Sequence, residues 1–158
     1  MSTETRRTKE TLRLWLRMLP LTSLVEQDLR GRLRDRFAVT LPQFDVMAEL
    51  ERAGEPQTMS ALSRKLLVSG GNVTGVVDRL ERSGYVQRQP LPNDRRVQLV
   101  ALSEKGRAEF AAMAEAHEQW LAELFVGLSD EELHALNELL ARAKAVVRGN
   151  LADDREND

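Results

Sequence analysis

The sequence predicts a mainly α-helical protein with a small β-hairpin wing, and three observations support this. Apolar residues recur at helical spacing through both ends of the 158-residue chain. Between residues 60 and 83 the pattern predicts two short helices joined by about four residues. Directly after Gly84 the apolar period changes from that of a helix to that of a strand, for two short runs. Together these features predict a winged helix-turn-helix core flanked by N- and C-terminal helices.

The N-terminal segment, residues 1–39, is predicted to form one long helix. Pro20 interrupts its apolar pattern, so we expect a kink or a break at that point. A second helix should begin with Thr40 as its N-cap and with Gln43 completing a capping box. Gly54 should end it, because glycine readily adopts the left-handed conformation that closes a helix.

The next two helices form the predicted helix-turn-helix pair. Ser60 can cap the first helix, and either Ser69 or Asn72 can open the second, which should end at Gly84. The second helix has one apolar stripe and one polar face, the pattern of a helix that packs on a core and reads DNA. The stripe consists of Val73, Val76, Val77 and Leu80.

A β-hairpin is predicted after this helix, with strands over residues 85–88 and 97–102. Residues 90–96 form the predicted connection, which carries Asp94 and two adjacent arginines. Paired guanidinium groups would therefore lie at or near the hairpin tip. Residues 40–102 together form the predicted DNA-binding lobe.

The C-terminal part of the chain, residues 103–150, is predicted to form two more helices. Ser103 should cap the first of them. The second should begin with a capping box formed by Ser129 and Glu132. Residues 151–158 are short and acidic, and we expect them to be a flexible tail.

Composition excludes several classes of function. The chain has no apolar run of about 18 residues and no basic-then-apolar leader, so we expect a cytoplasmic protein that does not enter a membrane. It has no cysteine and only two histidines, which excludes thiolate chemistry and a histidine-rich metal cluster, and we expect no cofactor. No Ser/His/Asp arrangement and no glycine-rich phosphate loop after a strand is present, so an enzyme is not expected.

Charge is unevenly distributed along the sequence. The net charge is −2, but residues 60–107 contain nine Lys or Arg and four Asp or Glu and therefore carry +5. The remainder of the chain carries −7. A basic middle between acidic flanks favours nucleic acid as the partner of the middle segment.

The polar face of the second helix has side chains suited to reading a DNA groove. Asn72 can recognise adenine, and Thr74 can contact a thymine methyl group. Small residues at the start of this helix would let its backbone approach the groove floor, and the neighbouring basic side chains would contact phosphates. The predicted contacts of this region are Ser69, Gly70, Asn72, Thr74, Gly75, Arg79, Arg64 and Lys65.

The hairpin would supply a second DNA contact in the adjacent minor groove. A guanidinium inserted there is attracted by the focused negative potential of narrow A·T-rich stretches. Asp94 or Asp78 could fix one arginine by a bidentate interaction. We expect Asp94 to orient Arg96 as the groove contact and Arg95 to contact phosphate.

Residues 60–106 resemble the winged helix-turn-helix core of the multiple antibiotic resistance regulator (MarR) family. The helix order on both sides agrees as well, so the resemblance spans nearly the whole chain. The SGGNVTG stretch is most similar to regulators of aromatic-acid catabolism. The motifs that carry the resemblance are NVT at 72–74, VDRLE at 77–81, GYV at 84–86, DRR at 94–96 and VxLxxLSxxG at 97–106.

This resemblance implies a homodimer held by the N- and C-terminal helices. The dimer would repress transcription from a palindromic operator in double-stranded DNA and be released by a small aromatic carboxylate or its coenzyme A thioester. The apolar content of the first and last helices favours a dimer independently. The family's ligand site lies between the dimer helices and the DNA-binding lobe. Candidates for it, each of which could instead be a core or surface residue, are Arg13, Trp15, Leu16, Leu19, Arg30, Phe44, Met47, His117 and Trp120.

Two alternative functions remain open from the sequence. A transcriptional activator would have the same fold, because the outcome depends on operator position. A protein-binding adaptor could use the winged domain without DNA, and salt-dependent binding to a palindromic duplex would separate it from a regulator.

Overall fold

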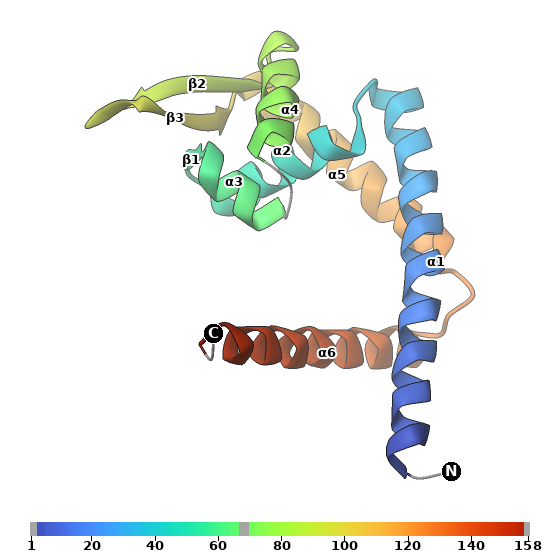
Figure 1. The fold of residues 1–158 in the computed structure, drawn as a ribbon. Helices are drawn as coiled ribbons and strands as arrows, with labels where there is room; N and C mark the ends of the chain where they lie inside the picture. The colour runs from blue at the N-terminus through green and yellow to red at the C-terminus, as the bar shows by residue number, and fades with distance from the viewer. Residues whose placement is uncertain (1–2, 67–69, 157–158) are drawn as a thin grey trace. The chain divides into compact units, whose positions relative to one another are not determined.

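The computed structural model describes residues 3–66 and 70–156, and the chain divides into two compact units, residues 1–121 and 122–158. The predicted fold class is confirmed: the chain is mostly helical, with a small three-stranded antiparallel sheet (Figure 1). In chain order the elements are α1 (Thr3–Phe37), α2 (Leu41–Ala53), β1 (Gln57–Thr58), α3 (Met59–Leu66), α4 (Gly70–Arg82), β2 (Val86–Leu91), β3 (Asp94–Leu102), α5 (Glu104–Leu124) and α6 (Asp130–Glu156).

Helix α1 passes through Pro20 without interruption, so the expected break is wrong. Proline removes a single helical hydrogen bond, whereas ending the helix there would forfeit the bonds of the turns that follow. Near its C-terminal end α1 buries Leu29 and Leu33 against the rest of the first unit. Its N-terminal half leaves large apolar side chains exposed, including Leu12 and Trp15.

The predicted limits of α2 are confirmed. Thr40 Oγ1 accepts a hydrogen bond from the Gln43 N–H at 3.3 Å, and Gln43 Oε1 accepts one from the Thr40 N–H at 2.9 Å. This reciprocal pair satisfies two donors that a helix start otherwise leaves open. Gly54 ends the helix with φ of +69°.

The start of α3 differs from the prediction, and one of the two predicted openers of α4 is wrong. Thr58, not Ser60, caps α3, because its Oγ1 accepts a hydrogen bond from the Ala61 N–H at 3.1 Å. Helix α4 begins at Gly70, which places Asn72 inside its first turn rather than at its opening. Ser69, the other predicted opener, lies outside the described residues. The predicted end of α4 is confirmed, since Gly84 follows it with φ of +78°.

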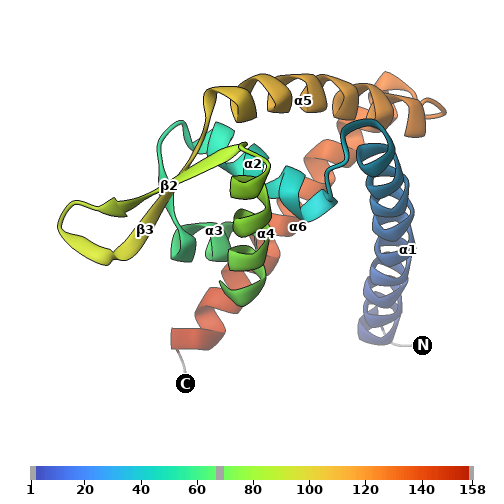
Figure 2. The ribbon, with the colours of Figure 1, turned by 90° about the horizontal axis from the view of Figure 1, so that it is seen from above.

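The hairpin strands are longer than predicted. Strand β2 reaches Leu91 and β3 begins at Asp94, so the expected connection over residues 90–96 is wrong and the arginine pair lies in a strand. Backbone pairing on both sides of the turn extends the ladder over residues that contain no alternating apolar signal. The sequence also gave no sign of β1, which has two residues and pairs with β3 at Leu99 and Val100. The hairpin projects away from α3 and α4 (Figures 1 and 2).

The core of the first unit forms around the apolar stripe of α4. All four predicted stripe residues are buried, and Val77 is completely inaccessible. Leu62 of α3 and Met47 of α2 are also fully buried. Burying a side chain of this size stabilises a protein by about 1.5–3 kcal/mol. The opposite face of α4 is consequently the face left to solvent.

A close backbone contact joins the base of the hairpin to the start of α5. Ser103 caps α5 as predicted, accepting a hydrogen bond from the Gly106 N–H at 2.9 Å, and its hydroxyl donates to the Gly84 carbonyl at 2.5 Å. The Ser103 N–H donates to the Tyr85 carbonyl at 3.0 Å. A Cβ at position 106 would lie 1.9 Å from the Tyr85 carbonyl oxygen. Only glycine allows this approach.

In the second unit, α6 begins with the predicted capping box. The Ser129 N–H donates to Glu132 Oε2 at 2.8 Å, and the Glu132 N–H donates to Ser129 Oγ at 3.1 Å. The helix continues to Glu156, into the segment that was expected to be a flexible tail. Its large apolar residues are exposed: Leu136, Leu139, Leu140, Val146, Val147 and Leu151. None of the helices in the described ranges is long and apolar enough to cross a membrane.

We predict that Gly106→Ala destabilises the protein by about 1–3 kcal/mol, the usual cost of overpacking, because the atom it meets is backbone and cannot rotate away. Gly31→Ala is the matched control, since position 31 of α1 has open space around an added Cβ. That change should be neutral or stabilise by up to about 1 kcal/mol. Urea unfolding of the two variants tests this, and equal stabilities would contradict it.

Candidate nucleic-acid interface

Helix α4 presents a polar face opposite its buried stripe. Asn72, Thr74 and Arg79 are exposed on this face. Gly75 lies among them, with no other atom near the position of its missing side chain. The structure therefore places three predicted contacts together and leaves space for a close approach beside them. Gly70 is the first residue of the helix.

The two basic residues at the end of α3 differ in their surroundings. Arg64 is exposed, whereas Lys65 forms an ion pair with Glu49 of α2 at 3.0 Å. The same carboxylate accepts hydrogen bonds from Arg52 at 2.6 and 2.9 Å. The Arg52 hydrogen bonds, together with Lys65, lower the pKa of Glu49 from its usual 4.5 to about 2. Lys65 thus ties the first helix of the pair to α2, and Arg64 is the better placed of the two for a phosphate.

On the wing, Asp94 holds Arg96 as the sequence predicted. Asp94 Oδ1 accepts hydrogen bonds from Arg96 Nε and from the Arg96 backbone N–H, both at 3.1 Å, and Oδ2 accepts one from Nη2 at 3.3 Å. These bonds lower the pKa of Asp94. The Arg96 side chain is nevertheless 91% exposed. A guanidinium that is both fixed in direction and open to solvent is prepared for an anionic partner.

Asp78, the other partner considered for the arginine pair, binds a different residue. Its carboxylate forms a hydrogen bond and ion pair with Arg88 of β2. Sequence reasoning did not identify Arg88 as a site residue. Its only signal was its position in the strand, two residues after the buried Val86, where an inward-facing side chain is expected.

Two adjoining hollows lie between α1, α2 and α4. The larger is about 560 Å³ and the smaller about 270 Å³, and Arg30, Asn72 and Val76 line both. Arg34 and Arg79 line the larger one only, together with apolar side chains from the start of α2. Because Asn72 and Val76 belong to α4, a molecule in either hollow would contact the helix that carries the candidate DNA-reading face.

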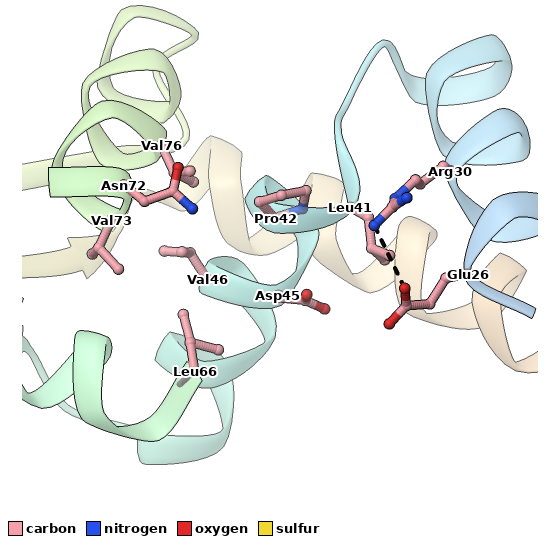
Figure 3. Close-up of a pocket in the computed structure, with 10 residues that line it drawn as sticks. All are labelled: Glu26, Arg30, Leu41, Pro42, Asp45, Val46, Leu66, Asn72, Val73 and Val76. Carbon is pink, nitrogen blue, oxygen red and sulfur yellow. Dashed lines mark hydrogen bonds and ion pairs between the residues drawn. The ribbon is translucent and has the colours of Figure 1, made fainter. Parts of the chain in front are cut away.

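The smaller hollow has an acidic side (Figure 3). Glu26 forms an ion pair with Arg30 at 3.5 Å, and Asp45 of α2 lies opposite them. Burial and the negative charge of Glu26 raise the pKa of Asp45, while Arg30 lowers it. The larger hollow is lined by three arginines and by no carboxylate, although Arg30 pairs with Glu26 and Arg34 pairs with Asp35 at 3.3 Å.

Five of the predicted ligand residues belong to α1 and do not form one site, and one of them, Leu16, is exposed. Arg30 lines both hollows. Trp15 and Leu19 instead line a separate groove of about 380 Å³ along α1. Arg13 forms an ion pair with Glu10.

The other four predicted ligand residues pack in the core of the described first unit. Phe44, Met47 and Trp120 are buried. His117 stacks on Phe44 with ring centroids 4.6 Å apart, and burial lowers its pKa. No cluster of three or more potential metal ligands occurs in residues 3–66 or 70–156.

Comparison with known proteins agrees with this geometry. The MarR family model matches residues 39–98. The transcriptional regulator YkoM of Bacillus subtilis, itself uncharacterised, is 34% identical over 77% of both chains. The regulator PecS of Dickeya dadantii is 27% identical over 84% of this chain and 81% of its own length. A mutant MarR of E. coli, solved in complex with operator DNA, superimposes with a TM-score of 0.74 at 28% identity over 85% of this chain and 95% of its own.

We predict that the Glu49 network contributes stability that acid removes. The pKa of Glu49 is depressed on folding, so its contribution is complete above pH 4.5 and is lost as the pH falls towards 2. Glu49→Gln should therefore be less stable than the parent chain at pH 7, and the difference should shrink by pH 3. Urea unfolding at both pH values measures this, and a difference that does not depend on pH would contradict it.

Proposed function

The chain belongs to the MarR family of DNA-binding transcriptional regulators, and from that premise we propose that it is a ligand-responsive repressor acting as a homodimer on a palindromic operator. The observation that carries the proposal is the Asp94–Arg96 pair, which is fixed in direction and exposed on the wing. The polar face of α4 would occupy the major groove while the wing reaches the adjacent minor groove.

Each part of this interface has a distinct proposed role. Asn72 and Thr74 would contact base edges, and Arg64, Arg79 and Arg95 would contact phosphates. Phosphate contacts position the protein, whereas base contacts select the sequence. Arg96 would enter the minor groove, where its attraction depends on groove width.

Homodimerisation is supported by the apolar surfaces left exposed on α1 and α6. Trp15 is 54% exposed and Leu139 is 62% exposed, and rows of exposed residues of this size mark association surfaces. Two copies related by a two-fold axis would place two α4 helices on half-sites about one DNA turn apart. A regulator of this kind would act in the cytoplasm.

The effector is proposed to be a small aromatic carboxylate or its coenzyme A thioester, as in the aromatic-catabolism branch of the family. The larger hollow supports this, because three arginines, Arg30, Arg34 and Arg79, line it together with apolar side chains that include Val39 and Leu41. An effector releases DNA only if it binds the free state more tightly than the DNA-bound state. Contact with Asn72 and Val76 would supply that difference.

A transcriptional activator would bind DNA in the same way. Expression from a promoter fusion, measured with and without the protein, distinguishes an activator from a repressor.

We predict that Arg96→Ala weakens operator binding at least about tenfold, since a groove arginine contributes about 1–3 kcal/mol. The dimer should remain intact, because Arg96 is on the exposed wing. Fluorescence anisotropy with an operator duplex measures affinity, and sedimentation measures the assembly. Unchanged affinity for the variant would refute the wing contact.

We also predict that an aromatic acid or its thioester raises the melting temperature of the free protein and weakens operator binding. Arg34→Gln should lower the affinity for that compound about tenfold, because a hydrogen bond to a charged group contributes about 1.5–3 kcal/mol. Arg36→Gln is the matched control, since Arg36 packs over Phe37 and does not line either hollow. Equal effects of the two substitutions on ligand affinity would exclude the larger hollow as the site.

A further inference from the structure

Arg88 occupies a position in β2 where an apolar side chain would be expected. It lies directly opposite Val100 in the ladder, and paired residues of antiparallel strands point to the same face of the sheet. Val100 is completely buried, and Val86, two residues before Arg88, is also buried. The Arg88 side chain is only 21% exposed. A guanidinium in such a place is costly unless nearby charges compensate it.

Two carboxylates of α4 provide that compensation. Asp78 accepts a hydrogen bond from Arg88 Nη2, and Glu81 Oε2 lies 3.9 Å from Arg88 Nε. Asp78 and Glu81 are three residues apart and so lie on the same side of the helix. The buried Nε–H of Arg88 has no hydrogen-bond partner, so Glu81 acts on it through charge alone. These contacts join the side chains of α4 to the inner face of the wing.

We propose that Arg88 is a positioning residue that sets the angle of the wing relative to α4. The Arg88 bridge, meaning Arg88 with Asp78 and Glu81, would hold Arg96 at the minor groove while α4 occupies the major groove. This assignment rests on the proposed DNA binding. Arg88 itself faces inward and makes no contact with DNA in this arrangement.

The distance from the bridge to the wing tip makes this angle important. Arg96 lies four residues before Val100 on β3, which is at most about 13 Å along the strand, because a register shift leaves residues 95–97 outside the regular pairing. A tilt of about 10° at the bridge would move Arg96 by up to about 2 Å at that strand rise. Functional groups must be held within about 0.5 Å of their productive position. The contact between Tyr85 and Gly106 also fixes the hairpin. It lies at the base of the hairpin, however, and is therefore farther from Arg96 than the Arg88 bridge is.

Because Asp78 and Glu81 are negatively charged, replacing them can distinguish a positioning role from general electrostatic attraction to DNA. Asp78 and Glu81 add two negative charges to the helix that is proposed to enter DNA, and Arg88 neutralises one of them. Removing both acids with Asp78→Asn/Glu81→Gln makes the interface more positive. If only attraction mattered, this variant would bind every duplex more tightly. If the bridge positions the wing, it would lose the contribution of Arg96 instead.

A double-mutant cycle on operator affinity tests the inference. In the parent chain Arg96→Ala should weaken binding at least about tenfold. In the Asp78→Asn/Glu81→Gln background the same change should cost less than about threefold, because the two sites are coupled. The matched control is Glu115→Gln/Glu118→Gln, an exposed pair on α5 with the same spacing and charge change, where the full cost of Arg96→Ala should remain.

The outcomes of the cycle distinguish failure of the wing contact with DNA from failure of the positioning role of Arg88. If Arg96→Ala has no effect in the parent chain, the wing contact fails and the positioning role fails with it. If Arg96→Ala costs the same in all three backgrounds, DNA binding by the wing stands and the role of Arg88 is refuted.

A measurement without DNA provides a second readout. The chain has no cysteine, so Asn93→Cys at the hairpin turn can carry a single nitroxide label. The label should become more mobile when Asp78 and Glu81 are replaced, and it should not change when Glu115 and Glu118 are replaced. Equal mobility in the parent and the Asp78→Asn/Glu81→Gln variant would overturn the inference.

Discussion

The approach of Gly106 to the main chain of Tyr85 is the constraint on which the DNA-binding lobe depends. Two short junctions meet at this point: one joins the end of α4 to β2, and the other joins the end of β3 to α5. Ser103 bonds both Gly84 and Gly106, so a single hydroxyl closes one element and starts another. The base of the wing is fixed against the first turn of α5, because no side chain separates Gly106 from the Tyr85 main chain.

Elsewhere in the lobe, ion pairs with acidic residues determine which basic side chains join elements together and which remain available to DNA. Glu49 pairs with Lys65, Asp78 with Arg88, and Asp94 with Arg96. The first two pairs join elements of the lobe to each other, and the third orients an exposed side chain. Arg64, Arg79 and Arg95, by contrast, form no ion pair among the described residues. The positive charge of the middle segment is therefore divided between holding the lobe together and remaining available to phosphates.

The hollows beside α4 place the proposed effector site and the proposed reading face on one helix. Asn72 and Val76 line both hollows, and Asn72 is also exposed on the polar face. A helix contacted from both sides cannot shift on one side without shifting on the other. The proposed release of DNA by a ligand follows from this shared helix and does not need a longer path through the protein.

The helices, most of their ends and the presence of a wing could be predicted from the sequence, because these depend on residues within about four positions of each other. The capping boxes at Thr40 and Ser129 and the pairing of Asp94 with Arg96 are local in this sense. Packing between elements decided how far the hairpin extends and that a two-residue strand ending at Thr58 pairs with β3. It also decided that Arg88 faces Asp78, ten residues away, and that Lys65 faces Glu49. Those partners meet only after helices and strands have packed, so no spacing along the chain could have identified them.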